Sequence, residues 1–113
     1  MLKIYHNTRC SKSRCTLDLL KESGQPYEVV EYLKNAPSET ELKEILQKLN
    51  LKPEQLLRKG EAVYKENFAG KTFSDEEWIK IMVENPVLIE RPIVVNGDKA
   101  VIGRPPENVL TIL

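Results

Sequence analysis

The amino-terminal third of the chain predicts a strand, a helix and a second strand, and this order constrains the fold more than any other feature. Residues 2–5 are a short β-prone run, and residues 27–32 (YEVVEY) are a second one. Between them, residues 12–23 have helical periodicity that stops at Gly24. A helix between two strands is the usual crossover of a parallel pair. We therefore predict a βαβ unit whose helix begins close to Cys10.

The middle of the chain predicts several helices. Ser38 and Ser74 each stand three residues before a glutamate, which is the spacing of a capping box, and apolar residues follow each pair at helical spacing. Between them, we expect a shorter helix over residues 53–58, opened by a proline, and another short helical segment before Gly70. Residues 37–86 are thus expected to form a helical insertion.

The last part of the chain predicts a hairpin and a final helix. Residues 93–95 and 100–102 are β-prone runs on either side of Asn96-Gly97-Asp98-Lys99, a strong turn signal, and Pro105-Pro106 opens a helix toward Leu113. The order β-α-β, helices, β-β-α predicts an α/β (α+β) chain with a thioredoxin-like fold. We expect a four-stranded mixed sheet, with the helical insertion between the βαβ and ββα halves, as a single domain over residues 1–113.

Composition limits the partners of this chain. Seventeen Lys and Arg residues balance 17 Asp and Glu residues, so no overall basic field exists to hold nucleic acid or an anionic membrane. The apolar runs are far shorter than the ~18 residues that span a bilayer, and no secretory signal pattern opens the sequence. We expect a cytoplasmic monomer that binds neither nucleic acid nor membrane, and any anion site must be local.

Cys10 is the strongest candidate for chemistry because it lies immediately before the predicted start of a helix. The unsatisfied N–H groups and the positive end of the helix dipole at that point stabilise an anion such as a thiolate. The first acidic residue of the chain is Asp18, and the residues before it carry four positive charges, on Lys3, Arg9, Lys12 and Arg14. A cysteine that only fills space in a loop is the alternative, and the local charge favours the reactive thiol.

The residues around Cys10 predict a site with one thiol. Ser13 occupies the second-cysteine position of a Cys-x-x-Cys pair, and we expect its hydroxyl to donate to the thiolate. Cys15 lies five residues beyond Cys10, an offset that in a helix separates the Cα atoms by ~8.6 Å, whereas a disulfide needs less than ~7 Å. We expect Cys15 to be a small core residue on the same face as Leu19. Three interpretations of His6 stay open: a proton relay, a cation beside the thiolate, or a solvated residue at the end of the strand.

Metal and cofactor requirements follow from the same residues. Two cysteines and the single His6 cannot complete a closed Cys/His tetrahedral zinc site without carboxylates, so we expect no metal and no bound cofactor. A single thiol that attacks a substrate needs its resolving thiol from elsewhere. We therefore expect an external reductant such as glutathione as co-substrate.

Three arginines, Arg58, Arg91 and Arg104, lie next to residues that end structural elements. Taken singly, each is typical of an exposed ion pair worth less than ~1 kcal/mol. Arg91 differs because the proline that follows it, Pro92, lies just before the predicted hairpin, and a proline before a thioredoxin-type hairpin is commonly cis and faces the reactive cysteine loop. We predict that Pro92 is cis, that it packs against the loop carrying Cys10, and that this placement brings Arg91 to the thiol.

Four motifs together resemble the glutaredoxin-coupled arsenate reductase family, and the resemblance spans essentially the whole chain. The motifs are residues 4–14 (IYHNTRCSKSR), 56–59 (LLRK), 90–95 (ERPIVV) and 102–106 (IGRPP). The resemblance implies that Cys10 attacks arsenic, and that Arg58, Arg91 and Arg104 hold the oxyanion and the covalent adduct. It also implies that glutathione attacks the adduct and that glutaredoxin removes the glutathionyl group.

The resemblance further implies that His6 and Ser13 favour the thiolate. Two other functions stay open beside arsenate reduction. A glutaredoxin-like thiol transferase would need Cys10 but not the three arginines together. A non-enzymatic redox regulator that binds RNA polymerase belongs to a related branch of this fold, but that branch typically carries Cys-x-x-Cys, and here Ser13 replaces the second thiol.

Overall fold

The computed structural model describes residues 2–113, which fall into two compact units. One unit, called here the sheet unit, combines the two ends of the chain, up to Asn35 and from Arg91 onward. The other, called here the helical unit, is Ala36–Glu90 and corresponds to the predicted helical insertion. That residues 1–113 act as a single domain stays a prediction.

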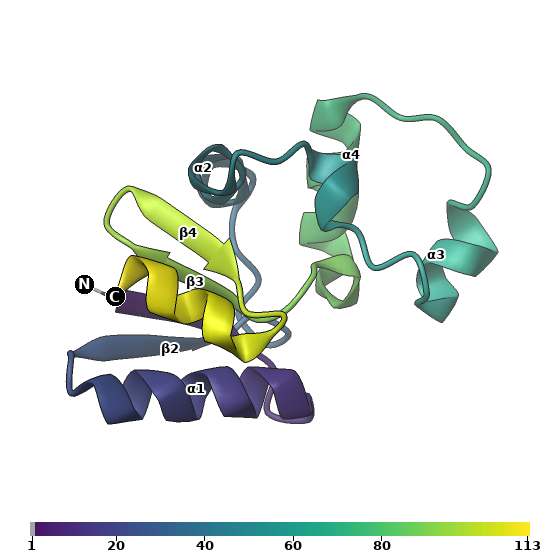
Figure 1. The fold of residues 1–113 in the computed structure, drawn as a ribbon. Helices are drawn as coiled ribbons and strands as arrows, with labels where there is room; N and C mark the ends of the chain where they lie inside the picture. The colour runs from purple at the N-terminus through teal and green to yellow at the C-terminus, as the bar shows by residue number, and fades with distance from the viewer. Residues whose placement is uncertain (1) are drawn as a thin grey trace. The chain divides into compact units, whose positions relative to one another are not determined.

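The sheet unit contains a mixed four-stranded sheet (Figure 1). Its strands are β1 (Leu2–His6), β2 (Tyr27–Glu31), β3 (Ile93–Asn96) and β4 (Lys99–Ile102), in the order β2-β1-β3-β4. β1 pairs with β2 in parallel and with β3 antiparallel, and β3 and β4 form the antiparallel hairpin. The predicted α/β class with a four-stranded mixed sheet is confirmed. β1 reaches one residue further than the predicted run of residues 2–5 and ends at His6.

Two helices pack against each other and against this sheet. α1 (Ser11–Ser23) is the crossover between β1 and β2, and it ends at Gly24, whose φ of 74° lies in the left-handed region that glycine adopts readily. The last segment, η3 (Pro106–Ile112), is a 3₁₀ helix that follows the hairpin and contacts α1. The predicted βαβ unit and the helical end of the chain are both present.

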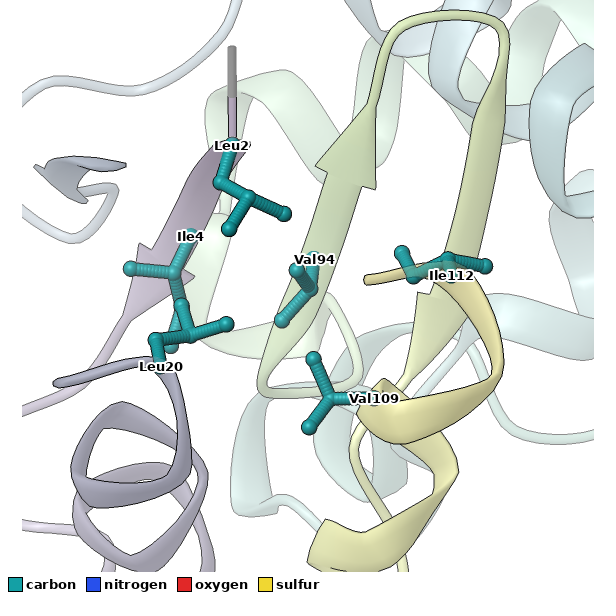
Figure 2. Packing of buried hydrophobic residues seen from close by; sticks show 6 residues of the cluster. All are labelled: Leu2, Ile4, Leu20, Val94, Val109 and Ile112. Atoms are coloured by element: carbon teal, nitrogen blue, oxygen red, sulfur yellow. The ribbon is translucent and has the colours of Figure 1, made fainter. Parts of the chain in front are cut away.

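A cluster of buried apolar side chains joins the sheet to these helices (Figure 2). Leu20 of α1 lies against Ile4 of β1, while Val109 and Ile112 of η3 lie toward Val94 of β3. Burial of each such side chain contributes about 1.5–3 kcal/mol. The cluster therefore packs α1 against the strands.

The helical unit contains five helical segments. They are α2 (Glu39–Leu49), η1 (Pro53–Leu56), α3 (Ala62–Asn67), α4 (Asp75–Glu84) and η2 (Pro86–Leu88). Both predicted N-caps are confirmed: the Ser38 hydroxyl accepts from the N–H of Glu41 at 3.1 Å, and the Ser74 hydroxyl accepts from the N–H of Glu77 at 3.2 Å. Within residues 2–113, every helix is too short or too polar to cross a membrane.

The prediction of one helix from residue 53 to residue 58 is wrong. η1 ends at Leu56, and the next residue, Leu57, forms an isolated antiparallel bridge with Ile89. The N–H of Glu90 donates to the carbonyl of Leu56 at 2.9 Å, on one side of that bridge. These long-range hydrogen bonds require an extended backbone, which the local helix signals could not reveal.

Replacing Leu20 with alanine tests the packing of α1 on the sheet. Leu20 is fully buried, so Leu20→Ala removes contacts and leaves a cavity, and we expect a loss of about 2–5 kcal/mol in the free energy of unfolding, measured in urea. Leu110 in η3 is 55% exposed and provides the matched control, with an expected change within about 0.5 kcal/mol. Equal losses in the two variants would contradict the assigned core.

Candidate active site

The loop between β1 and α1 places Cys10 at the N-cap of α1. The N–H of Cys10 donates to the carbonyl of Asn7 at 3.0 Å, and the N–H of Arg9 donates to the Asn7 Oδ1 at 3.0 Å, so the loop is a tight turn built on Asn7. The backbone of Cys10 is extended, and its carbonyl accepts from the N–H of Arg14 at 3.0 Å, which begins the helix. The sulfur therefore lies at the positive end of the α1 dipole, as the sequence predicted.

Two arginines from the other end of the chain contact the Cys10 sulfur. The Nη2 of Arg104 donates to Cys10 Sγ at 3.3 Å, and the guanidinium of Arg91 also hydrogen bonds to the sulfur. The two arginines are joined as well, because the Nε of Arg104 donates to the carbonyl of Arg91 at 2.7 Å. The peptide bond between Arg91 and Pro92 is cis, in agreement with the sequence-based prediction. The role of Arg91 in substrate binding stays a prediction.

The charge environment lowers the pKa of the Cys10 thiol below its ordinary value. Burial acts to raise this pKa, since Cys10 is only 8% exposed. The backbone N–H of Ser13 and the guanidinium groups of Arg91 and Arg104 act in the opposite direction, and the balance lowers the pKa. The N–H of Ser13 belongs to the first turn of α1, so its effect on the sulfur is that of a helix N-terminus on an anion.

Ser13 acts on the thiol through its backbone, and the prediction that its hydroxyl donates to the thiolate is wrong. The side chain of Ser13 is fully buried, and its Oγ lies 2.7 Å from the Nδ1 of His6. The same Oγ accepts from the N–H of Asn7 at 3.1 Å. Because the first turn of α1 directs this hydroxyl toward the end of β1, it holds the loop and the histidine rather than the sulfur.

His6 is a buried residue, so the interpretation of it as a solvated histidine is wrong. Burial lowers the pKa of His6 below its ordinary value; the charge of Glu31 opposes this effect, and smaller effects of Arg14 and Lys21 add to the lowering. The imidazole is therefore mainly neutral at neutral pH, which argues against a cation beside the thiolate. A proton-relay role for His6 stays a prediction.

Arg58, the third predicted oxyanion ligand, lies in the helical unit. Its Nη1 donates to Glu90 Oε1 at 2.7 Å, and its Nε donates to Glu61 Oε1 at 3.2 Å. The side chain is about one-fifth exposed, so these pairs are partly shielded from water. Its convergence with Arg91 and Arg104 on one oxyanion stays a prediction.

The prediction that Cys15 is a core residue is wrong, because Cys15 is exposed on α1. The buried face of α1 carries Ser13, Thr16 and Leu20, at i, i+3 and i+7. At 100° per residue, Cys15 lies about 160° from Ser13 around the helix. Two of the three buried positions carry polar residues, so a prediction based on the spacing of apolar residues does not find this face. Both cysteines are free thiols.

Sequence reasoning missed other residues that shape the site. The Arg104–Pro105 bond is cis like the bond before Pro92, so the chain contains two cis Arg-Pro pairs on either side of the hairpin. The repeated Arg-Pro dipeptide was the available signal. The buried Tyr32 also acts on Arg91: burial acts to lower the pKa of Arg91, but Cys10 and Tyr32 raise it, so this guanidinium stays charged.

Metal ligands do not gather at this site. Across residues 2–113, His, Cys, Asp and Glu side chains form no group of three or more with the geometry to hold a metal ion. The chemistry that the described residues support is nucleophilic attack by a thiolate on a substrate whose negative charge is held by guanidinium groups.

The pH dependence of Cys10 alkylation tests the electrostatics of the site. Because the pKa of the thiol is lowered, the thiolate fraction reaches its maximum at a lower pH than for an ordinary cysteine, whose pKa is about 8.5. Alkylation rates should be measured in a Cys15→Ser variant, since Cys15 is exposed and would also react. An inflection at or above ~8.5 would show that the activation is absent.

The chain resembles known proteins along its whole length. The family model described as the ArsC family matches residues 5–112. An uncharacterized protein of Escherichia coli (strain K12), YfgD, is 52% identical, with 99% of this chain and 96% of that protein covered. The arsenate reductase of Haemophilus influenzae is 47% identical over 97% of each chain. A solved structure of the arsenate reductase from Vibrio cholerae is 47% identical and covers 99% of this chain and 97% of its own, with a TM-score of 0.94. This chain belongs to the ArsC family.

Proposed function

We propose that this chain reduces arsenate to arsenite through a covalent adduct on Cys10, which glutathione and glutaredoxin resolve. The observation that carries the proposal is the convergence of Arg91 and Arg104 on a buried thiol of lowered pKa at a helix N-terminus. Relatives that share 47% of their residues with this chain are named arsenate reductases, which supports an oxidoreductase acting on this oxyanion.

The two guanidinium groups favour an oxyanion over an uncharged substrate. A guanidinium presents its N–H groups as a planar fork that matches two oxygens at once, and a tetrahedral oxyanion offers several such oxygens. Arg91 is partly buried and remains charged, so it retains its affinity for anions throughout the neutral pH range. A thiol transferase acting on a glutathionyl disulfide has no comparable need for two cations on the sulfur.

The first chemical step is attack of the Cys10 thiolate on arsenic. A sulfur–arsenic bond forms, one arsenic–oxygen bond breaks, and the departing oxygen leaves as water after it takes up protons from solvent. Arsenic stays in the pentavalent state in this step. The lowered pKa of Cys10 raises the fraction of thiolate available for this attack, and the arginines offset the charge of the remaining oxygens.

The second step needs a thiol from outside the chain, because Cys15 lies on the far side of α1 and Ser13 replaces a second cysteine. A glutathione thiolate attacks the Cys10 sulfur, the sulfur–arsenic bond breaks, and its electron pair stays on arsenic, which leaves as arsenite. The product on the protein is a Cys10–glutathione disulfide. A thiolate of glutaredoxin then takes over the glutathionyl group and restores the Cys10 thiol.

Substitution of the arginines tests the substrate. Arg91→Ala or Arg104→Ala removes charge-assisted hydrogen bonds worth ~1.5–3 kcal/mol, so we expect arsenate turnover to fall ~10 to 150-fold in an assay with glutathione and glutaredoxin. Lysine at either position should recover only part of the rate, because it keeps the charge without the planar fork. Arg58→Ala in the same assay tests whether this arginine shares the role that the family resemblance implies. Unchanged turnover in both the Arg91 and Arg104 variants would contradict oxyanion binding at Cys10.

Substitution of the cysteines separates the proposed function from the thiol-transferase alternative. We expect Cys10→Ser to abolish arsenate turnover. Cys15→Ser should leave most of it, because Cys15 is exposed and points away from the buried face of α1. Omission of glutathione should abolish arsenite release by the unmodified chain, because arsenic stays pentavalent in the Cys10 adduct. Negligible arsenate turnover, together with reduction of a glutathionylated disulfide that needs Cys10 but tolerates loss of the arginines, would favour the transferase instead.

A further inference from the structure

Thr16 is a buried polar residue that the proposed chemistry does not use. Its side chain is fully buried on the face of α1 that also carries Ser13. The Thr16 hydroxyl donates to the carbonyl of Lys12, one turn earlier, at 2.9 Å, which is a common way for a helical threonine to satisfy its hydroxyl. The same oxygen also lies 3.3 Å from the carbonyl oxygen of Gly103, 87 residues away in sequence.

Gly103 is closely packed between Thr16 and Pro92. A Cβ atom at Gly103 would lie 2.6 Å from Thr16 Oγ1 and 2.8 Å from Pro92 Cγ, distances that real Cβ atoms essentially never show. The N–H of Gly103 donates to the carbonyl of Pro92 at 2.9 Å. Thr16 therefore meets the backbone of the segment that follows β4 at a point where no side chain intervenes.

The residues next to this contact are the two arginines of the site. Arg91 precedes Pro92, Arg104 follows Gly103, and the Nε of Arg104 donates to the carbonyl of Arg91 at 2.7 Å. Cys10 is the N-cap of the helix that carries Thr16, six residues before it, so the rise of the helix places them about 9 Å apart along its axis. Because Arg104 is the residue after Gly103, the contact that fixes the position of Gly103 on Thr16 also fixes the position of Arg104 relative to the start of α1.

We propose that Thr16 is a positioning residue, whose hydroxyl holds Gly103 at the distance that places the Arg104 guanidinium on the Cys10 sulfur. The proposal rests on the proposed role of Cys10 as the nucleophile. Replacing the hydroxyl with a methyl group, as in Thr16→Val, removes the hydroxyl hydrogen that the Gly103 carbonyl shares with the carbonyl of Lys12, and puts a larger group against Gly103. The segment then moves away from α1, and the guanidinium moves with it.

The experiment measures the pKa of the Cys10 thiol from the pH dependence of its alkylation, in the Cys15→Ser chain. We expect Thr16→Val to raise this pKa by about 0.5 or more, since a displaced cation favours the thiolate less. Thr16→Ser keeps the hydroxyl and should leave the inflection close to that of the parent. Combining Thr16→Val with Arg104→Ala should give the pKa of Arg104→Ala alone, because Thr16 acts through that guanidinium.

Two controls separate positioning from a general loss of stability. Leu20→Ala removes a buried side chain one turn further along the same face, and it should lower the melting temperature without moving the thiol pKa. If Thr16→Val fails to fold, Thr16→Ala carries the same comparison, since it also removes the hydroxyl. An unchanged pKa in a folded Thr16→Val or Thr16→Ala variant, an equal shift in Leu20→Ala, or shifts that add fully to that of Arg104→Ala would each overturn the proposal.

The titration does not depend on arsenate, so the two proposals can fail separately. A parent chain with a lowered thiol pKa but no arsenate turnover would contradict the proposed function, while the response of the thiol to Thr16→Val would still decide the role of Thr16. If turnover is present, a pKa that ignores Thr16 would contradict only the positioning role.

Discussion

An ionised Cys10 is a buried negative charge, and a charge at that depth is stable only where donors and opposite charges surround it. The protein supplies them from two directions. On one side, the crossover from β1 into α1 presents the backbone N–H groups of the first helical turn. On the other side, the segments that flank the β3–β4 hairpin bring in Arg91 and Arg104. The mixed sheet and the apolar cluster under it hold these two sides together.

The positive charge at the site comes from groups that do not titrate near neutral pH. Burial lowers the pKa of His6, so the imidazole is mainly neutral there, and it serves as a partner of the Ser13 hydroxyl at the base of the loop. Arg91 keeps its charge because Cys10 and Tyr32 raise its pKa against the effect of burial. The groups around Cys10 therefore keep their charge states near neutral pH, and ionisation of the thiol is the event that changes the charge of the site.

The sequence predicted the features that depend on local signals. Ser38 and Ser74 were recognisable as caps, the Asn96–Lys99 turn predicted the hairpin, and the position of Cys10 at a helix start followed from the helical pattern beyond it. The errors arose where a polar side chain is buried. Thr16 and Ser13 occupy the buried face of α1, so Cys15 was assigned to the core in their place, and the Ser13 hydroxyl was assigned to the sulfur. Burial of polar groups depends on partners distant in sequence, which spacing along one helix does not show.

The register of the β3–β4 hairpin sets the separation of Arg91 and Arg104. Ile93 pairs with Ile102 at the open end of the ladder, and each arginine lies two residues outside that pair, Arg91 before it and Arg104 after it. A longer loop at the tip, around Gly97, would leave this end unchanged. A single residue inserted into either strand would change the alternation of the ladder and put one arginine out of phase with the other. The site therefore tolerates residues inserted at the tip of the hairpin. It does not tolerate residues inserted within the strands.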